Sequence, residues 1–519
     1  MASGYWLTGL IAIPALGALV LLMQENARAV WRAALVFSLL PLAISLWLFA
    51  AFDPAQPGYQ FVEQYPWIPQ FGVSYHVGLD GISLLLVLLT TILITLSILY
   101  SGGGDIESRP REFCIFMLLL ETGLLGALVA LDLFLFYVFW ELMLFPMYFL
   151  IGIWGHGRKI YAALKFVLFT MLGSILMLVA ILYLAGAARA HMGRLTFDLP
   201  LLYDVPLTPT EARWLFAGFA LAFAIKVPMW PVHTWLPDAH TEAPTAGSVI
   251  LAGVMLKMGT YGFLRFAIPL FPVVAVQAAP LFMALAVVGI IYGALVAMVQ
   301  PDLKRLVAYS SVSHLGFVML GIFAFNIQGA EGALFQMLNH GLSTGGLFLL
   351  VGMIYMRRHT REISEFGGLW RSVPVMAAIF MVVMLSSIGL PGLNGFVGEF
   401  LILLGTFLST WPAAAFAVSG IILGALYMLW TYERVMFGPI TREINETIRD
   451  LSPREIAVMV PLLVLMFFMG LYPRPLLERM EPALAMVLSR VQVAQAQIRH
   501  SNPPALALAS QLRAPLDRK

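Results

Sequence analysis

Three of the six lysines in the chain lie inside long apolar stretches, where a charged side chain is costly: Lys165, Lys226 and Lys257. The loops between these stretches use arginine almost exclusively, since 24 of the 30 basic residues are arginine. Arginine does not release its proton in a protein, whereas a buried lysine can do so. The distribution therefore indicates that arginine supplies fixed charge and that lysine stands where a proton can leave.

An acidic residue, Glu141, lies in the middle of another apolar stretch. A carboxylate inside a membrane is expensive unless it is paired or protonated. Lys226 is its natural partner, because Pro228 and Pro231 follow the lysine and interrupt the helix, which admits water to the backbone. The pair can transfer a proton or simply hold two helices together. Because intramembrane ionisable residues are functional by default, proton transfer is the favoured interpretation.

A second group of ionisable residues lies farther along the chain. Lys257 has glycines on both sides that permit close helix packing, and no carboxylate is near it in the sequence. Such a lysine suits a proton relay. His340 lies in the middle of a later stretch, and histidine ordinarily titrates near neutral pH. It is either a hydrogen-bonded core residue or a proton shuttle, and the hydroxyls of Ser343 and Thr344 would extend a proton wire from it.

Other residues are secondary candidates for the proton path. Lys165 lies one turn inside its stretch and either reaches the membrane surface or transfers protons. His314 is open to a core role or a proton role. Glu399 follows a break rich in proline and glycine, so it is a terminal proton group or a helix cap. His233 and Asp238 follow the first break, where turn hydrogen bonds explain them better than a metal site, because typical ligand spacing is absent.

The composition is that of a membrane protein, with 61% hydrophobic and 11% charged residues and a mean hydropathy of +0.89. A net charge of +2 gives no indication of a nucleic-acid partner. A single cysteine, Cys114, excludes an internal disulfide and a cysteine-rich iron–sulfur site. About fourteen apolar stretches are long enough to span a bilayer. They lie at 4–23, 31–52, 79–100, 112–130, 132–152, 160–186, 211–232, 243–268, 278–299, 303–325, 329–356, 372–408, 412–437 and 454–472.

Two of these stretches are interrupted by proline and glycine, at 226–231 and 390–395. Each is the fourth stretch of a block of five. Broken helices at matching positions are typical of transporters built from inverted repeats. We therefore expect an all-α polytopic membrane protein of about 14 transmembrane helices, with two inverted five-helix repeats that each contain a discontinuous helix. The expected parts are 1–110 (helices 1–3), 111–270 (first repeat), 271–438 (second repeat) and 439–519 (helix 14 and an amphipathic tail that ends in disorder).

The basic residues also predict the orientation. Most lie in the odd-numbered loops, which the positive-inside rule places in the cytoplasm, so both termini are expected outside. Arginines in the tail, among them Arg474, Arg479, Arg490 and Arg499, would then lie outside, which this rule does not favour, and the sequence offers no explanation for them. The basic residues of the odd loops are Arg28, Arg32, Arg109, Arg111, Arg158, Lys159, Lys304, Arg305, Arg357, Arg358, Arg361, Arg371, Arg434, Arg442, Arg449 and Arg454.

Two long motifs, at 234–257 (TWLPDAHTEAPTAGSVILAGVMLK) and 301–314 (PDLKRLVAYSSVSH), resemble signatures of the antiporter-like membrane subunits of respiratory complex I, the NADH:quinone oxidoreductase. The resemblance covers nearly the whole chain. Glu399 replaces the lysine that is usual in other branches, which is similar to the branch called chain M or subunit 4. The resemblance implies that Glu141 and Lys226 form a coupled pair, that Lys257 and His340 form a central relay, and that Glu399 is the terminal group.

The resemblance also implies the partners. They are the other membrane subunits of complex I, including paralogous antiporter-like subunits, together with lipids. NADH, FMN, iron–sulfur clusters and quinone are expected in partner subunits. This chain is expected to hold no cofactor and no metal, since it has neither a dinucleotide-binding fingerprint nor a Walker lysine. The expected location is the bacterial cytoplasmic (inner) membrane, with both termini on the periplasmic side.

Three alternatives stay open. A subunit of a multi-chain Na⁺/H⁺ antiporter would share the fold, although Glu399 in place of lysine argues against it. A structural membrane anchor would use the buried charges only to lock helices together. A small-solute transporter is disfavoured, because the sequence shows no polar substrate cavity.

Overall fold

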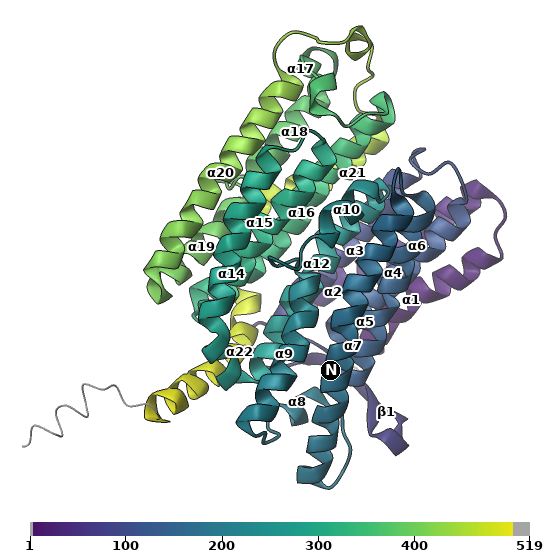
Figure 1. Cartoon of the computed structure of the whole chain (residues 1–519). Coiled ribbons are helices and arrows are strands. Elements are labelled where there is room, and N and C mark those ends of the chain that lie inside the picture. The colour runs from purple at the N-terminus through teal and green to yellow at the C-terminus, as the bar shows by residue number, and fades with distance from the viewer. Residues whose placement is uncertain (1–3, 502–519) are drawn as a thin grey trace, which may run out of the picture.

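The computed structural model describes residues 4–501, and nearly all regular structure in them is helical (Figure 1). The end of the tail, where disorder is predicted, lies outside the described residues. The N-terminal part consists of α1 (Trp6–Leu22), α2 (Ala27–Ala51), β1 (Gln60–Ile68), the turn η1 (Pro69–Phe71), β2 (Val73–Leu79) and α3 (Gly81–Ser101).

The next part contains the first broken helix. It consists of α4 (Pro110–Val129), α5 (Leu133–Leu142), α6 (Leu144–Trp154), α7 (Lys159–Met192), α8 (Leu199–Leu202), α9 (Pro209–Lys226) and α10 (Trp235–Glu242). One long helix then combines α11 (Thr245–Ile250), η2 (Leu251–Met255), α12 (Leu256–Gly262), η3 (Phe263–Ala267) and α13 (Ile268–Leu270), in which η2 and η3 are π-helical turns.

The C-terminal part contains the second broken helix. It consists of α14 (Pro272–Met298), α15 (Leu303–Phe323), α16 (Ile327–Arg358), η4 (Ile363–Glu365), α17 (Leu369–Ser372), α18 (Pro374–Ser387), α19 (Asn394–Ser409), α20 (Trp411–Met436), η5 (Glu443–Glu446), α21 (Pro453–Leu471) and α22 (Arg474–Ser501).

The predicted membrane architecture is confirmed in its main features. Eleven helical segments of the described chain are long and apolar enough to cross a membrane. The other three predicted stretches correspond to α1, with 17 residues, and to the two broken helices α9–α10 and α18–α19. The count of about fourteen crossings and the division into repeats stay predictions.

The helices that carry the buried polar residues lie at the centre of the bundle (Figure 1). The apolar windows of the α11–α13 helix and of α16 are completely enclosed by the rest of the chain, and that of α15 nearly so. Outer helices expose apolar side chains instead, such as Leu168 on α7 and Phe416 on α20, which are 65% and 63% exposed. The fold therefore keeps its ionisable groups away from the hydrocarbon, where each would be costly.

A β-hairpin, which the sequence analysis did not predict, fixes the start of α5. Strands β1 and β2 pair antiparallel. The backbone N–H and the hydroxyl of Ser74 on β2 donate to Oδ2 of Asp132, at 2.9 and 3.0 Å. The other carboxylate oxygen of Asp132 caps α5 by accepting from the N–H groups of Phe134 and Leu135. The hairpin thus positions the helix that carries Glu141.

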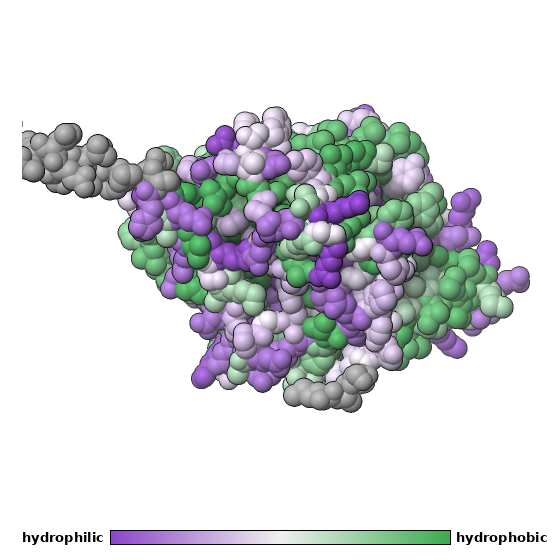
Figure 2. All heavy atoms as spheres, turned by 90° about the horizontal axis from the view of Figure 1, so that it is seen from below, coloured by the Kyte–Doolittle hydropathy of each residue, from purple (hydrophilic) through white to green (hydrophobic). Residues whose placement is uncertain are grey.

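Helix α22 packs across the face of the bundle opposite to the arginine-rich loops, and Figure 2 shows hydrophilic residues spread over this face. Its arginines have local partners. Arg474 pairs with Glu478 at 2.6 Å, and Arg490 donates to the carbonyl oxygen of Pro269 at 3.1 Å. The Arg479 backbone comes so close to Gly81 of α3 that a Cβ at Gly81 would overlap its carbonyl group. These contacts explain why basic residues are tolerated on this side.

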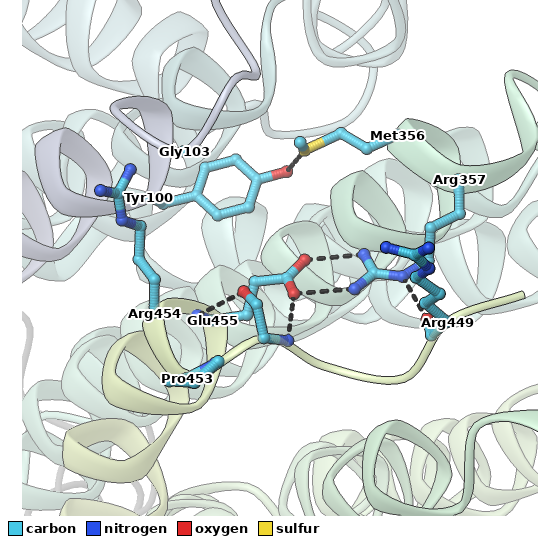
Figure 3. A pocket seen from close by; sticks show the side chains of 9 residues that line it. Tyr100, Gly103, Met356, Arg357, Arg449, Pro453, Arg454 and Glu455 are labelled. Carbon is cyan, nitrogen blue, oxygen red and sulfur yellow. Dashed lines mark hydrogen bonds and ion pairs between the residues drawn. The ribbon is translucent and has the colours of Figure 1, made fainter.

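An ion pair on the arginine-rich face joins α16 to α21. Arg357 donates to both carboxylate oxygens of Glu455, at 2.7 Å each (Figure 3). Glu455 also completes the capping box of α21 with Ser452. The pair borders a pocket of about 760 Å³, whose lining includes Arg449 and Arg454. This bidentate geometry fixes the relative position of the two helix ends.

A second ion pair is buried near the opposite face. Arg265, next to the end of the α11–α13 helix, donates to Asp80 at 2.5 Å and to the hydroxyl of Tyr59 at 3.1 Å. Both charged side chains are almost fully enclosed. Asp80 also caps α3 by accepting from the N–H groups of Ile82 and Ser83. One guanidinium therefore links α3 to the central helix of the bundle.

We expect Arg265→Gln to lower the free energy of unfolding by about 3–5 kcal/mol, because it leaves the buried Asp80 carboxylate without its charged partner. The exposed Arg213→Gln on α9, near the same face, is the matched control. Thermal unfolding of the purified protein measures the difference. Equal melting temperatures for the two variants would contradict the structural role of this pair.

Candidate functional site

Lys226 is the last residue of α9, and the helix stops there because Pro228 and Pro231 follow. The indole N–H of Trp235, the first residue of α10, donates to the carbonyl oxygen of Ile225 at 2.9 Å. This hydrogen bond connects the two half-helices across the break. The lysine is only 2% exposed. A cationic side chain is thus held at a helix end, where the last carbonyl groups of α9 favour positive charge.

Glu141 lies near the end of α5, and its charge interacts with that of Lys226 without a direct ion pair. No carboxylate oxygen of residues 4–501 lies within 4.0 Å of Lys226 Nζ. The Ser174 hydroxyl on α7 donates a hydrogen bond to Glu141 instead. Lys226 Nζ lies 5.1 Å from the ring centre of Trp140 and 5.6 Å from that of Phe166, within cation–π range. The predicted pair is therefore separated by a gap.

Lys257 and His340 are in direct contact. Nζ of Lys257 lies 2.5 Å from Nδ1 of His340, and both side chains are buried. The ammonium also donates to the carbonyl oxygen of Ala252, five residues earlier, in the π-helical turn η2. When Lys257 is protonated, Nδ1 of His340 must accept, so the ring proton sits on Nε2. The two groups can thus share one excess proton.

A row of polar side chains continues from His340 to Glu399, although no hydrogen bond joins the two histidines in the described residues. The ring centres of His340 and His314 are 5.8 Å apart. His314 Nδ1 lies 3.3 Å from Oε1 of Glu399, which also accepts a hydrogen bond from the Gln336 side chain at 3.1 Å. Glu399 is the sixth residue of α19, so it lies inside the half-helix after its break. Lys226, in contrast, ends the half-helix before its break, so the two residues lie on opposite sides of their breaks.

Hydroxyl groups lie beside this chain at the second break. Ser343 and Ser386 are 2.5 Å apart, and Ser386 donates to the side-chain oxygen of Asn394 at 2.6 Å. A cavity of about 10 Å³, the scale of one water molecule, lies between these helices. Thr344 lines it together with His314, Gln336, Asn339, His340, Ser343, Ser386, Ser387 and Gly395. The predicted role of Ser343 and Thr344 as proton carriers remains a prediction.

The other secondary candidates lie around the first break. Lys165 on α7 forms an ion pair with Asp238 on α10 at 2.7 Å, which the sequence analysis did not foresee. Both side chains are partly exposed, at 21% and 28%. The ring of His233 packs edge-on against Tyr292, with ring centres 5.0 Å apart. In residues 4–501 no group of three or more His, Cys, Asp or Glu side chains is placed to hold a metal ion.

Two buried side chains that were not among the predicted proton-path residues lack hydrogen-bond partners in the described chain. Neither ring nitrogen of His240 on α10 has one, and its ring stacks on Phe348 at 4.7 Å between centres. Both carboxylate oxygens of Glu121 on α4 are also without one. Glu121 lies within an apolar stretch, so the criterion that found Glu141 would have found it. His240 lies in a polar connection, where no periodicity predicts burial.

A family model described as NADH:quinone oxidoreductase/Mrp antiporter, TM matches residues 130–424. The NADH-quinone oxidoreductase subunit M of Rhodobacter capsulatus is 50% identical over 471 residues, which cover 89% of this chain and 90% of the relative. This chain belongs to the NADH:quinone oxidoreductase/Mrp antiporter membrane family. The subunit M of Mycobacterium tuberculosis is 42% identical, with 94% of each chain covered.

Solved structures of the NADH:quinone oxidoreductase/Mrp antiporter family agree with this fold. A chain of respiratory complex I from Thermus thermophilus with bound NADH has a TM-score of 0.84 and 35% identity, covering 93% of this chain and 99% of that one. A chain of the Mrp complex from a Dietzia species has a TM-score of 0.84 at 24% identity, covering 94% and 98%. At that identity the second likeness shows the shared fold alone.

The Lys165–Asp238 contact predicts a coupled pair that tethers α10 to α7. We expect each single change, Lys165→Met or Asp238→Leu, to lower the free energy of unfolding. The double variant should lose less unfolding free energy than the two single losses added together. The coupling free energy should be about 0.5–1 kcal/mol, because both groups are partly exposed. A double-mutant cycle of melting temperatures measures it. Strict additivity would contradict a tether and leave an independent proton role for Lys165.

Proposed function

We propose that this chain moves protons across the membrane, as a subunit of an NADH:quinone oxidoreductase, through Glu141, Lys226, Lys257, His340 and Glu399. The observation that carries the proposal is the buried chain of contacts from Lys257 through His340 and His314 to Glu399. The relatives named NADH-quinone oxidoreductase subunit M and the 35% identical chain of complex I support the same assignment. Such a chain of ionisable groups across enclosed helices matches the requirements of a proton relay.

In the proposed mechanism, Glu141 controls the proton on Lys226 across the gap between them. While the Glu141 carboxylate is near, the positive charge on Lys226 is stabilised. When charges of a neighbouring subunit draw Glu141 away, Lys226 releases its proton toward Lys257. Moving one charge against 100 mV requires about 2.3 kcal/mol, and one pKa unit corresponds to about 1.36 kcal/mol. Changes in local electrostatics are therefore large enough to drive the step.

Proton transfer onward uses the groups that touch each other. Lys257 passes its excess proton to His340 through the Nζ–Nδ1 contact. His314 then connects His340 to the carboxylate of Glu399, which delivers the proton to the second membrane face. This chain takes part in the enzyme as a subunit, and the subunit itself has no redox centre. NADH, FMN, iron–sulfur clusters and quinone bind in partner subunits, which include paralogous antiporter-like subunits.

The proposed location is the inner membrane of a bacterium, with lipid around the bundle. The arginine-rich face would lie in the cytoplasm, following the positive-inside rule, and both termini in the periplasm. The alternative function, a subunit of a multi-chain Na⁺/H⁺ antiporter, is less well supported. The Mrp likeness concerns the fold alone, and Glu399 occupies the place of the usual lysine.

We expect Glu141→Gln and Lys226→Ala each to reduce NADH-driven quinone reduction and proton uptake by at least about 100-fold, because each removes a proton-transfer group or its control. Inverted membrane vesicles of the variant strains measure both activities. Oxidation of NADH by an artificial electron acceptor controls for assembly and should stay normal.

Glu112→Gln, whose side chain on α4 at the arginine-rich face is 43% exposed, is the control substitution. Full proton uptake in Lys226→Ala membranes would refute the proposed relay. If all activities stayed normal and only sodium tolerance changed, the antiporter function would be the correct one.

A further inference from the structure

A polar cavity of about 460 Å³ lies at the arginine-rich face, between the loops that follow α3 and α6 and the end of α16. Two acidic and two histidine side chains line it: Asp105, Glu107, His156 and His359. It differs from the small cavity beside His340, and none of its lining residues belongs to the relay proposed above. A cavity of this size holds many water molecules, so protons reach its walls from the adjoining aqueous phase.

Asp105 differs from the other acidic group of this cavity. Its Oδ1 accepts a hydrogen bond from the Thr245 hydroxyl at 3.3 Å, at the start of α11. Its Oδ2 is shielded from solvent and has no hydrogen-bond partner within residues 4–501. Burial raises the pKa of Asp105 to about 6, against the opposing effects of the Lys304 charge and the Thr245 hydrogen bond. Glu107, in contrast, is exposed.

Lys304 at the start of α15 interacts with the charge of Asp105 from inside the bundle. The lysine is 5% exposed, and its ammonium donates to the carbonyl oxygen of Ala243. No carboxylate oxygen of the described chain lies within 4.0 Å of it. Its ammonium is also within the electrostatic influence of the charges on Asp302, Glu242 and Arg361. Lys304 is thus a buried amine without a direct ion pair, next to a carboxyl group that faces water.

His240 belongs to the same segment as Ala243, whose carbonyl oxygen Lys304 contacts. Its ring is fully buried and interacts with the charges of both Lys304 and Lys257. Neither ring nitrogen has a hydrogen-bond partner in the described residues. The Ser248 hydroxyl donates to the carbonyl oxygen of His240 at 3.1 Å, which ties α10 to the helix that carries Lys257. Segment 240–248 therefore gathers Asp105, Lys304 and His240 beside the helix that carries Lys257, through the contacts of Thr245, Ala243 and Ser248.

We propose that Asp105 is a proton-uptake group that supplies Lys257 from the arginine-rich face through Lys304 and His240. Water in the cavity protonates the Asp105 carboxylate, and the carboxyl group later returns its proton to the neutral amine of Lys304. Only a proton moves, so no oxidant or reductant is needed. This inference rests on the proposed function above. It adds an uptake branch that reloads Lys257 from the arginine-rich face, while proton release along the relay still depends on the Glu141–Lys226 pair.

The first experiment measures NADH-driven proton uptake by inverted vesicles that carry the complete enzyme. We expect Asp105→Asn to lower uptake at least about tenfold, because the amide cannot carry a proton. Asp105→Glu should restore most of it, and Glu112→Gln, a partly exposed acid on the same face but outside the cavity, should have no effect. Uptake by Asp105→Asn vesicles equal to that of Glu112→Gln vesicles would overturn the proposal.

The second experiment does not depend on how well Asp105→Asn folds. The single cysteine of the chain is buried, so Cys114→Ala provides a background in which Asp105→Cys is the only thiol. A membrane-impermeant sulfonate thiol reagent is applied to inverted and to right-side-out vesicles. Labelling of this subunit, read by intact mass, should occur only from the arginine-rich face, and vesicles of the Cys114→Ala background should stay unlabelled at this subunit. Labelling only from the other face would overturn the proposal.

A third variant separates this inference from the proposed function. If Lys257→Ala abolishes uptake while Asp105→Asn retains it, the uptake branch is wrong and the relay stands. If both variants retain full uptake, the relay itself is wrong. If both lose uptake while NADH oxidation by an artificial acceptor persists, the branch and the relay are both supported.

Discussion

The whole structure depends on one constraint: inside a bilayer, every backbone polar group must be satisfied within the protein, and an ionisable side chain exposed to hydrocarbon is costly. The chain meets it by enclosing the helices that carry ionisable side chains, α11–α13, α15 and α16, behind outer helices such as α7 and α20. This enclosure has a second effect. In surroundings of low polarity, charges interact more strongly than in water, so the protonation of one group changes the energy of the next.

Irregular backbone and ionisable side chains occur at the same places. Lys226 ends a half-helix, Glu399 lies just past the second break, and Lys257 follows a π-helical turn whose Ala252 carbonyl oxygen it contacts. A regular helix uses its backbone groups internally and leaves none for a side chain. Interrupting the backbone hydrogen bonds of the helix provides carbonyl acceptors for a buried ammonium. Neighbouring side chains then bond the other free carbonyl groups, as Trp235 does at the first break.

Residue types within apolar stretches were enough to predict the membrane fold, both broken helices and the residues from Glu141 to Glu399, because burial in a membrane can be derived from local hydropathy. Contacts between distant segments were not predictable in this way. Lys165 and Asp238 are 73 residues apart, and neither position specifies the other. The β-hairpin escaped notice because β1 is largely exposed and lacks an alternating apolar pattern. Loop residues such as Asp105 become buried only when several loops meet.

The π-helical turn η2 also limits how the sequence of this helix can change. Such a turn holds one more residue than a regular turn, and each residue of an α-helix rotates the chain by about 100°. Deleting a single residue between Leu251 and Met255 would restore a regular helix, in which the backbone bonds close the turn and the Ala252 carbonyl oxygen no longer accepts from Lys257, although no functional side chain had been altered. The segment is therefore sensitive to changes in length even where it tolerates changes in residue type. Alignments of relatives should place gaps outside it.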